Sequence, residues 1–124
     1  MPLKILAIDD SRTMRGMLSE ALTEAGFETY LAEDGEDGLQ KLEEVQPDLV
    51  ITDINMPRLD GFGFIDAVRA DRRHMGLPIL VLTTESAQEL KDRARRAGAS
   101  GWIVKPFHET KLVSAIRRVA AKEA

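Results

Sequence analysis

The sequence contains no cysteine, which excludes disulfide bonds, thiolate metal ligands and thiol nucleophiles. It also lacks any apolar run near the roughly 20 residues that a membrane-spanning helix requires. Its first residues have neither the long apolar stretch nor the cleavage site of a signal peptide. We therefore expect a cytoplasmic protein with no membrane partner. The net charge of −4 at pH 7 argues against a nucleic-acid partner, because nucleic acids are bound by basic surfaces.

Internal repeats, low-complexity segments and linkers rich in proline, glycine or serine are absent as well. The chain has 124 residues, and a single domain commonly has about 100 to 150. The composition, 44% hydrophobic and 31% charged, is that of an ordinary globular protein. We expect residues 1–124 to form one monomeric domain with no second module.

Five short apolar segments alternate with five segments of helical periodicity. In the first helical segment, Leu18, Ala21 and Leu22 recur three or four residues apart, and Gly26 stands where a helix is expected to end. Strands joined by helices must run parallel, and their nearly continuous apolar character indicates burial on both faces. We predict an α/β protein with a flavodoxin-like, doubly wound, five-stranded parallel sheet and five helices. The order 2-1-3-4-5 is adopted from known sheets of this kind. The predicted strands are 3–8, 27–32, 49–52, 79–83 and 102–104.

Polar residues stand at the carboxyl ends of these strands. Asp9 and Asp10 follow the first strand and Asp53 the third, while Thr83 closes the fourth and Lys105 follows the fifth. Because these ends meet at one edge of the sheet, the three carboxylates should be crowded. Two such charges about 4 Å apart repel by about 4 kcal/mol at an effective dielectric constant near 20. A hard divalent cation such as Mg²⁺ would relieve this repulsion, whereas the lack of cysteine and of a paired histidine motif disfavours zinc there.

A carboxylate beside Mg²⁺ and a lysine, with a hydroxyl opposite, is suited to forming an aspartyl phosphate. Asp53 is the central carboxylate and therefore the predicted phosphoacceptor. Plainer interpretations stay open for the other residues. Asp9 and Asp10 could cap the following helix, and Thr83 could be an ordinary β-branched strand residue. Lys105 could be a polar strand end joined by a trans peptide to a helix-starting proline.

These motifs resemble the receiver domain of bacterial response regulators, in particular the CheY-like, single-domain type, and the resemblance extends from Lys4 to the last helix. The resemblance implies that a sensor histidine kinase phosphorylates Asp53. It also implies that the Lys105-Pro106 bond is cis. The matching motifs are Asp9-Asp10, Asp53 within Thr-Asp-Ile-Asn-Met-Pro, Asp60-Gly61, Thr83 and Lys105-Pro106-Phe107.

The resemblance further assigns a role to each residue at this edge. It implies that Asp10, Asp53 and the carbonyl of Asn55 contact Mg²⁺, and that Asp9 helps through a water molecule. The phosphoryl oxygens would be bound by Thr83 and by the lysine of the Lys-Pro motif. Such a protein is a signalling switch that catalyses only its own phosphorylation and dephosphorylation.

Three positions concern the tuning of that switch. Asn55, two residues after the phosphoacceptor, and Glu85, two residues after Thr83, resemble positions that in chemotaxis regulators set how fast water attacks the acyl phosphate. Both could equally be solvated loop residues. Trp102 stands where receivers usually have a tyrosine or phenylalanine whose rotamer reports phosphorylation. The larger indole departs from that pattern, and it could simply fill the core beside the fifth strand.

The last two helices carry many basic residues. Receivers commonly bind protein targets on the face formed by the fourth helix, the fifth strand and the fifth helix, so the resemblance implies a protein partner there, and the basic charge favours an acidic surface on that partner over DNA. A solvated charged surface is the alternative. His74 and His108 are expected to be isolated surface residues. The basic residues are Lys91, Arg93, Arg95, Arg96, Arg117, Arg118 and Lys122.

Other functions remain open at this point. A Mg²⁺-dependent phosphohydrolase could use the same carboxylates, although it would need a substrate-capping insertion that the short loops do not provide. A binder of a flavin phosphate is disfavoured because the acidic edge would repel that anion. Among switches, the sequence favours a chemotaxis regulator, with a phosphorelay intermediate or another single-domain receiver as the alternatives.

Overall fold

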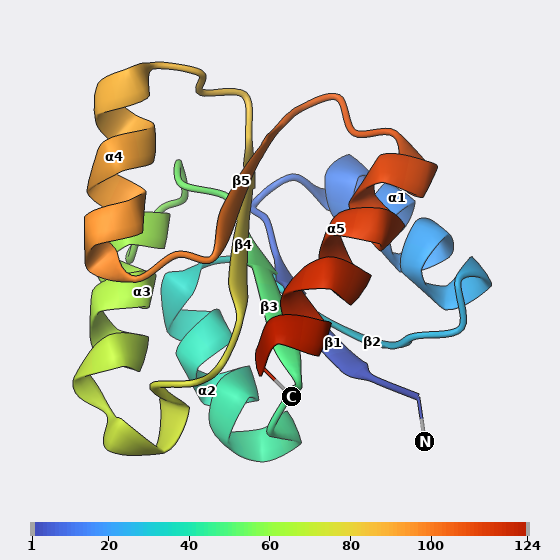
Figure 1. The fold of residues 1–124 in the computed structure, drawn as a ribbon, viewed down its shortest axis with the longest axis horizontal. Helices are drawn as coiled ribbons and strands as arrows, with labels where there is room; N and C mark the ends of the chain where they lie inside the picture. Colours follow the sequence, from blue (N-terminus) through green and yellow to red (C-terminus); the bar gives the residue numbers. More distant parts are fainter. Residues whose placement is uncertain (1, 124) are drawn as a thin grey trace.

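The computed structural model describes residues 2–123 and shows, within them, a parallel sheet flanked by helices (Figure 1). The strand order is β2-β1-β3-β4-β5, so the predicted order and fold class are confirmed. None of the helices within residues 2–123 is long and apolar enough to cross a membrane. The elements are β1 (Lys4–Ile8), α1 (Arg12–Glu24), β2 (Glu28–Ala32), α2 (Gly35–Val45), β3 (Leu49–Thr52), α3 (Gly61–Ala70), the 3₁₀ helix η1 (Arg72–His74), β4 (Ile79–Thr83), α4 (Gln88–Ala97), β5 (Gly101–Val104) and α5 (Glu109–Glu123).

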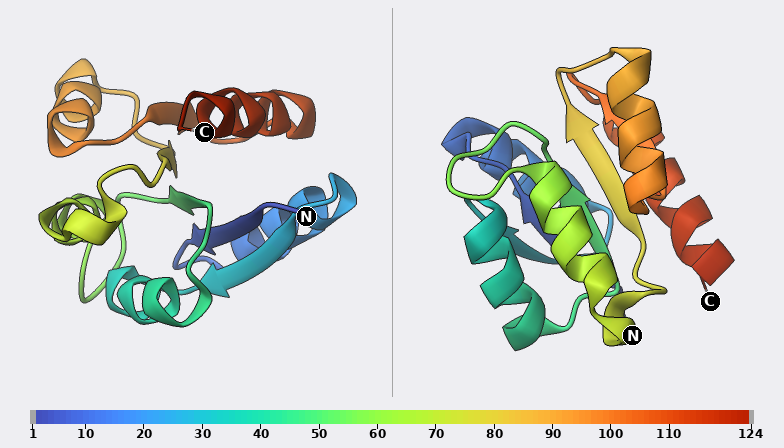
Figure 2. Two further views of the ribbon diagram at one scale, coloured as in Figure 1. Left: turned by 60° about the horizontal axis from the view of Figure 1, so that its bottom comes forward. Right: turned by 90° about the vertical axis from the view of Figure 1, so that its left-hand side faces the viewer.

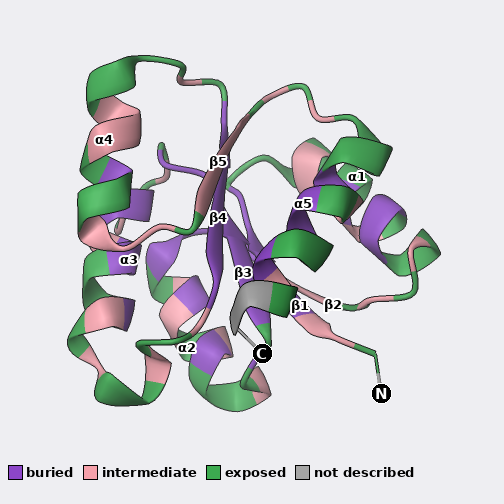
Figure 3. Cartoon of the chain, viewed as in Figure 1, coloured by how far each residue is buried: buried purple, intermediate pink, exposed green. Residues whose placement is uncertain are grey.

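Two helical layers cover the sheet, with α1 and α5 on one face and α2, α3 and α4 on the other (Figure 2). Successive side chains of β1 alternate between the layers. Ile5 and Ala7 pack with α1 and α5, whereas Leu6 and Ile8 pack with α2 and α3. All residues of β3 and β4 are buried (Figure 3). This double burial explains why the central strands are continuous apolar runs rather than alternating patterns.

The carboxyl ends of the strands and the segments that follow them form one edge of the sheet. Parallel pairing aligns β1 with β3, Ile8 lying opposite Thr52, and β4 with β5, Thr83 lying opposite Val104. The residues just beyond these positions therefore project from the same edge. The predicted strand limits differ from the observed ones by at most one residue, and only η1 has no predicted counterpart.

Candidate functional site

Three of the predicted site residues are in direct contact at this edge. Lys105 Nζ donates hydrogen bonds to Asp9 Oδ2 and Asp53 Oδ2, each at 2.7 Å. The exposed fractions of the Lys105, Asp9 and Asp53 side chains are 10%, 1% and 10%. Burial by itself would lower the pKa of Lys105, but the hydrogen bonds and charges of Asp53 and Asp9 outweigh it and raise that pKa above its ordinary value. Lys105 is therefore a protonated bridge between two buried carboxylates.

Asp10 completes a cluster of three carboxylates with Asp9 and Asp53. One carboxylate oxygen of each residue lies within 4.8 Å of the other two, so the predicted crowding is present. Asp10 is exposed, whereas the other two aspartates are buried. A set with one ligand open to solvent suits a hard divalent ion such as Mg²⁺, which binds one or two carboxylates and keeps several waters.

Backbone N–H groups orient the two buried carboxylates. Ile54 N–H donates to Asp53 Oδ1 at 2.6 Å, and Ser11 N–H donates to Asp9 Oδ1 at 2.9 Å. Both Oδ2 atoms are thereby turned toward Lys105. The cap of α1 is Ser11, whose Oγ accepts the N–H of Met14 at 3.2 Å. The interpretation of the aspartates as helix caps is therefore wrong.

The predicted tuning residues lie together beside the site. Asn55 Nδ2 donates to Glu85 Oε1 at 3.0 Å. Thr83 is fully buried, its Oγ1 accepts the N–H of Glu85 at 3.4 Å, and its carbonyl accepts the N–H of Lys105 at 2.8 Å. Asn55, which is exposed, and Glu85, which is half-buried, are thus hydrogen-bonded loop residues, and the ends of β4 and β5 are joined next to the carboxylates.

Trp102 connects β5 with the segment after β4. Its indole N–H donates to the backbone oxygen of Glu85 at 3.0 Å. The ring is half-buried and packs against the core cluster on the α2, α3 and α4 face. Trp102 therefore fills space beside β5 and also contacts the segment that follows Thr83. Whether its rotamer follows phosphorylation stays a prediction.

The segment between β3 and α3 passes close to the backbone of Asp53. Gly61 N–H donates to the Ile54 carbonyl at 2.9 Å, and Asp60 caps α3 by accepting the N–H of Gly63 at 2.8 Å. A Cβ on Gly61 would lie 2.7 Å from Ile54 Cα and closer still to the Asp53 carbonyl oxygen. Only glycine fits this approach without moving the backbone of Asp53 and Ile54.

Replacing Gly61 by alanine is therefore expected to destabilise the protein by about 1 to 3 kcal/mol, the usual cost of overpacking. It should also weaken Mg²⁺ binding, because the backbone that follows Asp53 must shift. Urea denaturation and a Mg²⁺ titration of Trp102 fluorescence would measure the two effects. Gly16 is the matched control, since a Cβ there would meet nothing within 4 Å. Equal behaviour of Gly61→Ala and Gly16→Ala would contradict the proposed close approach.

Sequence reasoning missed an ion pair that holds the same segment. Arg58 has a left-handed φ of 67°, and its Nε donates to Asp34 Oδ2 at 2.6 Å. Asp34 is 1% exposed and caps α2. Its pKa is lowered first by the N–H of Asp37 and further by Arg58, against the opposing effect of burial. Because the two residues are 24 positions apart and Arg58 lies in a loop, no sequence period links them.

Another prediction needs correction. His74 is not an isolated surface residue: its side chain is 16% exposed and its Nε2 lies 3.6 Å from Glu43 Oε1. His108 is exposed, as predicted. The basic face of α4, β5 and α5 stays a prediction. Two of its arginines contact aromatic rings, Arg93 that of a residue in α3 and Arg117 that of the residue just before β2. These contacts are Arg93 over Phe62 at 3.9 Å and Arg117 over Phe27 at 5.9 Å, while the side chain of Lys122 lies outside the described residues.

The Lys105-Pro106 peptide bond is cis, as the resemblance implied. The roles of Asn55 as a Mg²⁺ ligand and of Thr83 as a ligand of phosphoryl oxygens stay predictions. The structure nonetheless places both residues at the edge that carries the carboxylates, Asn55 after β3 and Thr83 at the end of β4.

Comparison with known proteins agrees with this geometry. The family described as "Response regulator receiver domain" matches residues 5–117. A probable chemotaxis protein CheY of Rhizobium etli is 40% identical over 118 residues, which cover 94% of this chain and 92% of that protein. The chemotaxis protein CheY of Pseudomonas aeruginosa is 38% identical over 118 residues, which cover 94% and 95%. The structure of chemotaxis response regulator CheY4 of Vibrio cholerae has a TM-score of 0.90 and 42% identity, and the match covers 96% of this chain and 99% of that one.

Proposed function

We propose that this chain, which belongs to the family of response regulator receiver domains, is a switch that accepts a phosphoryl group on Asp53. Receiver domains are signalling switches of two-component systems rather than classical enzymes, and they generally bind Mg²⁺ in an acidic pocket. The observation that carries the proposal is the shielded bridge from Lys105 Nζ to Asp53 and Asp9, at 2.7 Å each. It combines a nucleophilic carboxylate with a fixed positive charge next to a cluster suited to a divalent ion.

Each residue of the site has its own role in the proposed phosphoryl transfer. Asp53 attacks phosphorus with a carboxylate oxygen, a new oxygen–phosphorus bond forms, and the bond to the leaving group of the donor breaks. Lys105 exchanges its contact with Asp53 for one with a phosphoryl oxygen. Asp10, Asp53 and the carbonyl of Asn55 would hold Mg²⁺, with Asp9 acting through water, and the bound ion would supply positive charge to the phosphoryl oxygens.

After transfer, a change in the segment beyond β4 would carry the signal. In the proposal, Thr83 turns toward the phosphoryl group and donates its hydroxyl to a phosphoryl oxygen, and this turn moves Oγ1 away from the N–H of Glu85, from which it now accepts at 3.4 Å. Glu85 is bonded through its carbonyl to Trp102 and through its side chain to Asn55. Movement of Thr83 would therefore reach β5 through Trp102, and Asn55 and Glu85 would tune the attack of water on the acyl phosphate.

The proposal extends to partners and location. Receiver domains interact with histidine kinases and downstream targets, and a sensor histidine kinase would supply the phosphoryl group here. The face formed by α4, β5 and α5 would bind an acidic protein target. Because the similar proteins include chemotaxis regulators, we propose chemotaxis as the pathway, with residues 1–124 acting as a monomeric, single receiver domain in the cytoplasm.

Incubation with a small-molecule phosphodonor and Mg²⁺ tests the proposed reaction. Intact mass spectrometry should show the mass of one added phosphoryl group, and chelation of Mg²⁺ or the substitution Asp53→Asn should prevent the increase. Asp66 is exposed on α3, so Asp66→Asn is the control that should behave like the unchanged protein. An unchanged mass for the original chain, or equal labelling of Asp53→Asn, would rule the proposal out.

A further inference from the structure

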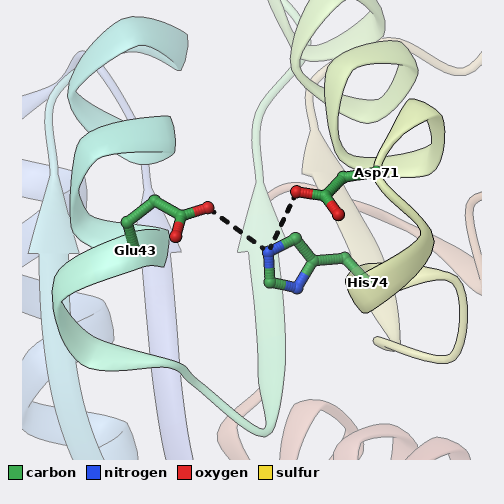
Figure 4. A group of neighbouring side chains, drawn as sticks. All are labelled: Glu43, Asp71 and His74. Atoms are coloured by element: carbon green, nitrogen blue, oxygen red, sulfur yellow. Dashed lines mark ion pairs between the residues drawn. The ribbon is translucent and has the colours of Figure 1, made fainter.

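A second group of ligand-type side chains lies at the opposite edge of the sheet from Asp53. Glu43 on α2 faces Asp71 and His74 at the connection between α3 and β4 (Figure 4). One ligand atom from each of the three lies within 4.8 Å of the other two. A cavity of about 590 Å³ adjoins Glu43 and His74, and it is lined by residues that precede strands, namely Leu3, Asp48 and Pro78.

The Nε2 atom of His74 is the informative feature of this group. It is shielded from solvent and, within residues 2–123, has no hydrogen-bond partner, which is unusual because an unsatisfied buried polar atom is costly. Nε2 nevertheless lies 3.6 Å from Glu43 Oε1 and 4.0 Å from Asp71 Oδ2. These separations are too long for hydrogen bonds. They approach the distance of about 3.3 Å between neighbouring ligands of a tetrahedral ion whose bonds are about 2.0 to 2.1 Å long.

We propose that His74, Glu43 and Asp71 bind one divalent transition-metal ion of the zinc class. Imidazole and carboxylate together suit such an ion, whereas Mg²⁺ and Ca²⁺ take oxygen ligands. The two carboxylates balance the charge of the ion, and Nε2 gains the partner that it lacks. Because Glu43 belongs to α2 and the other two ligands belong to the α3–β4 connection, the bound ion ties these two parts of the helical layer together.

Arg73 competes with the ion in this arrangement. Its Nη2 donates to Glu43 Oε1 at 2.9 Å and to Asp71 Oδ2 at 2.6 Å, which are the same oxygens that face His74. Hydrogen bonds from Arg73 also lower the pKa of Asp71 to about 2, so this carboxylate is ionised at neutral pH. The Arg73 side chain is 64% exposed, and it can turn into solvent when an ion takes its place.

Zinc titration by calorimetry, in the presence of excess Mg²⁺ to occupy the acidic edge, tests the site. The chain has only two histidines, so His108→Gln is the matched control for His74→Gln. His108→Gln should leave zinc affinity unchanged. His74→Gln should weaken zinc binding by at least about 10- to 100-fold, which is the usual cost of losing a hydrogen bond that supports a metal ligand. Arg73→Gln should bind zinc more tightly than the original chain, because it removes the competing cation.

A structural readout separates this site from zinc bound elsewhere. Zinc should shift the ring resonances of His74 in NMR spectra, and it should raise the melting temperature of the original chain more than that of His74→Gln. Equal zinc affinities of His74→Gln and His108→Gln would overturn the proposal. So would the absence of zinc binding in both the original chain and Arg73→Gln.

Discussion

Replacing Lys105 by methionine is expected to destabilise the Mg²⁺-free protein by about 3 to 5 kcal/mol, the typical cost of removing one partner from a buried ion pair. The two carboxylates that Lys105 contacts, Asp9 and Asp53, would remain buried with no cation between them. Methionine keeps much of the aliphatic length of lysine, so the change is mainly one of charge. Urea denaturation in the presence of a chelator measures this loss.

The pH of that measurement follows from the pKa of Lys105. Folding raises the pKa of Lys105. The stabilisation by Lys105 is therefore complete at any pH below its pKa in the unfolded chain, about 10.4. It is lost only as the pH rises through the higher pKa of the folded chain. A comparison near pH 7 therefore records the full contribution. The Lys105→Met variant should also be far slower than the original chain in accepting a phosphoryl group.

Added Mg²⁺ should restore more stability to Lys105→Met than to the original chain, because the ion would then replace the positive charge that Lys105 places between Asp9 and Asp53. The control is Lys111→Met, which removes an exposed lysine from α5 and should change stability by no more than about 0.5 kcal/mol. Equal stabilities of Lys105→Met and Lys111→Met without Mg²⁺ would contradict the role given to the bridge.

The second large effect is expected for Phe64→Ala, which should lower the free energy of unfolding by about 3 to 5 kcal/mol. Phe64 is fully buried in the cluster that joins β1, β3 and β4 to α2, α3 and α4. Its ring lies against α2, because a Cβ on Gly38 would come within 3.1 Å of Phe64 Cε1. Truncation therefore leaves a cavity between two helices and the sheet. Since a domain is stable by only about 5 to 15 kcal/mol, a large share of the total would be lost.

Met75→Ala provides the comparison for this change, because that side chain is 66% exposed and its loss should have little effect on stability. Chemical denaturation of the two variants gives both values. A cost below about 1 kcal/mol for Phe64→Ala would mean that the α2 and α3 layer does not pack as described.

The fold was largely predictable because its signals are local. Each strand is a short apolar run, and each helix repeats apolar residues every three or four positions, as Leu18, Ala21 and Leu22 do in α1. Burial on both faces made β3 and β4 continuous apolar runs. η1 escaped prediction because its three residues, Arg72–His74, are all polar and too few to show a period.

The candidate site was predictable for a different reason: parallel strands bring their carboxyl ends together, so Asp9, Asp53 and Lys105 had to converge once the strands were assigned. The contacts that depend on loop conformation were not predictable. Arg58, whose backbone is left-handed, contacts Asp34 from a loop 24 positions away. The position of His74 beside Glu43 likewise depends on how η1 packs against α2.

The central claim is that Asp53 is the residue that carries the phosphoryl group, and locating the modification tests it most directly. The protein would be treated with a phosphodonor and Mg²⁺, the acyl phosphate reduced with borohydride, and the peptides sequenced by mass spectrometry. The account predicts a single modified residue, at position 53. Modification at another aspartate with an intact Asp53, or no modified aspartate at all, would contradict it.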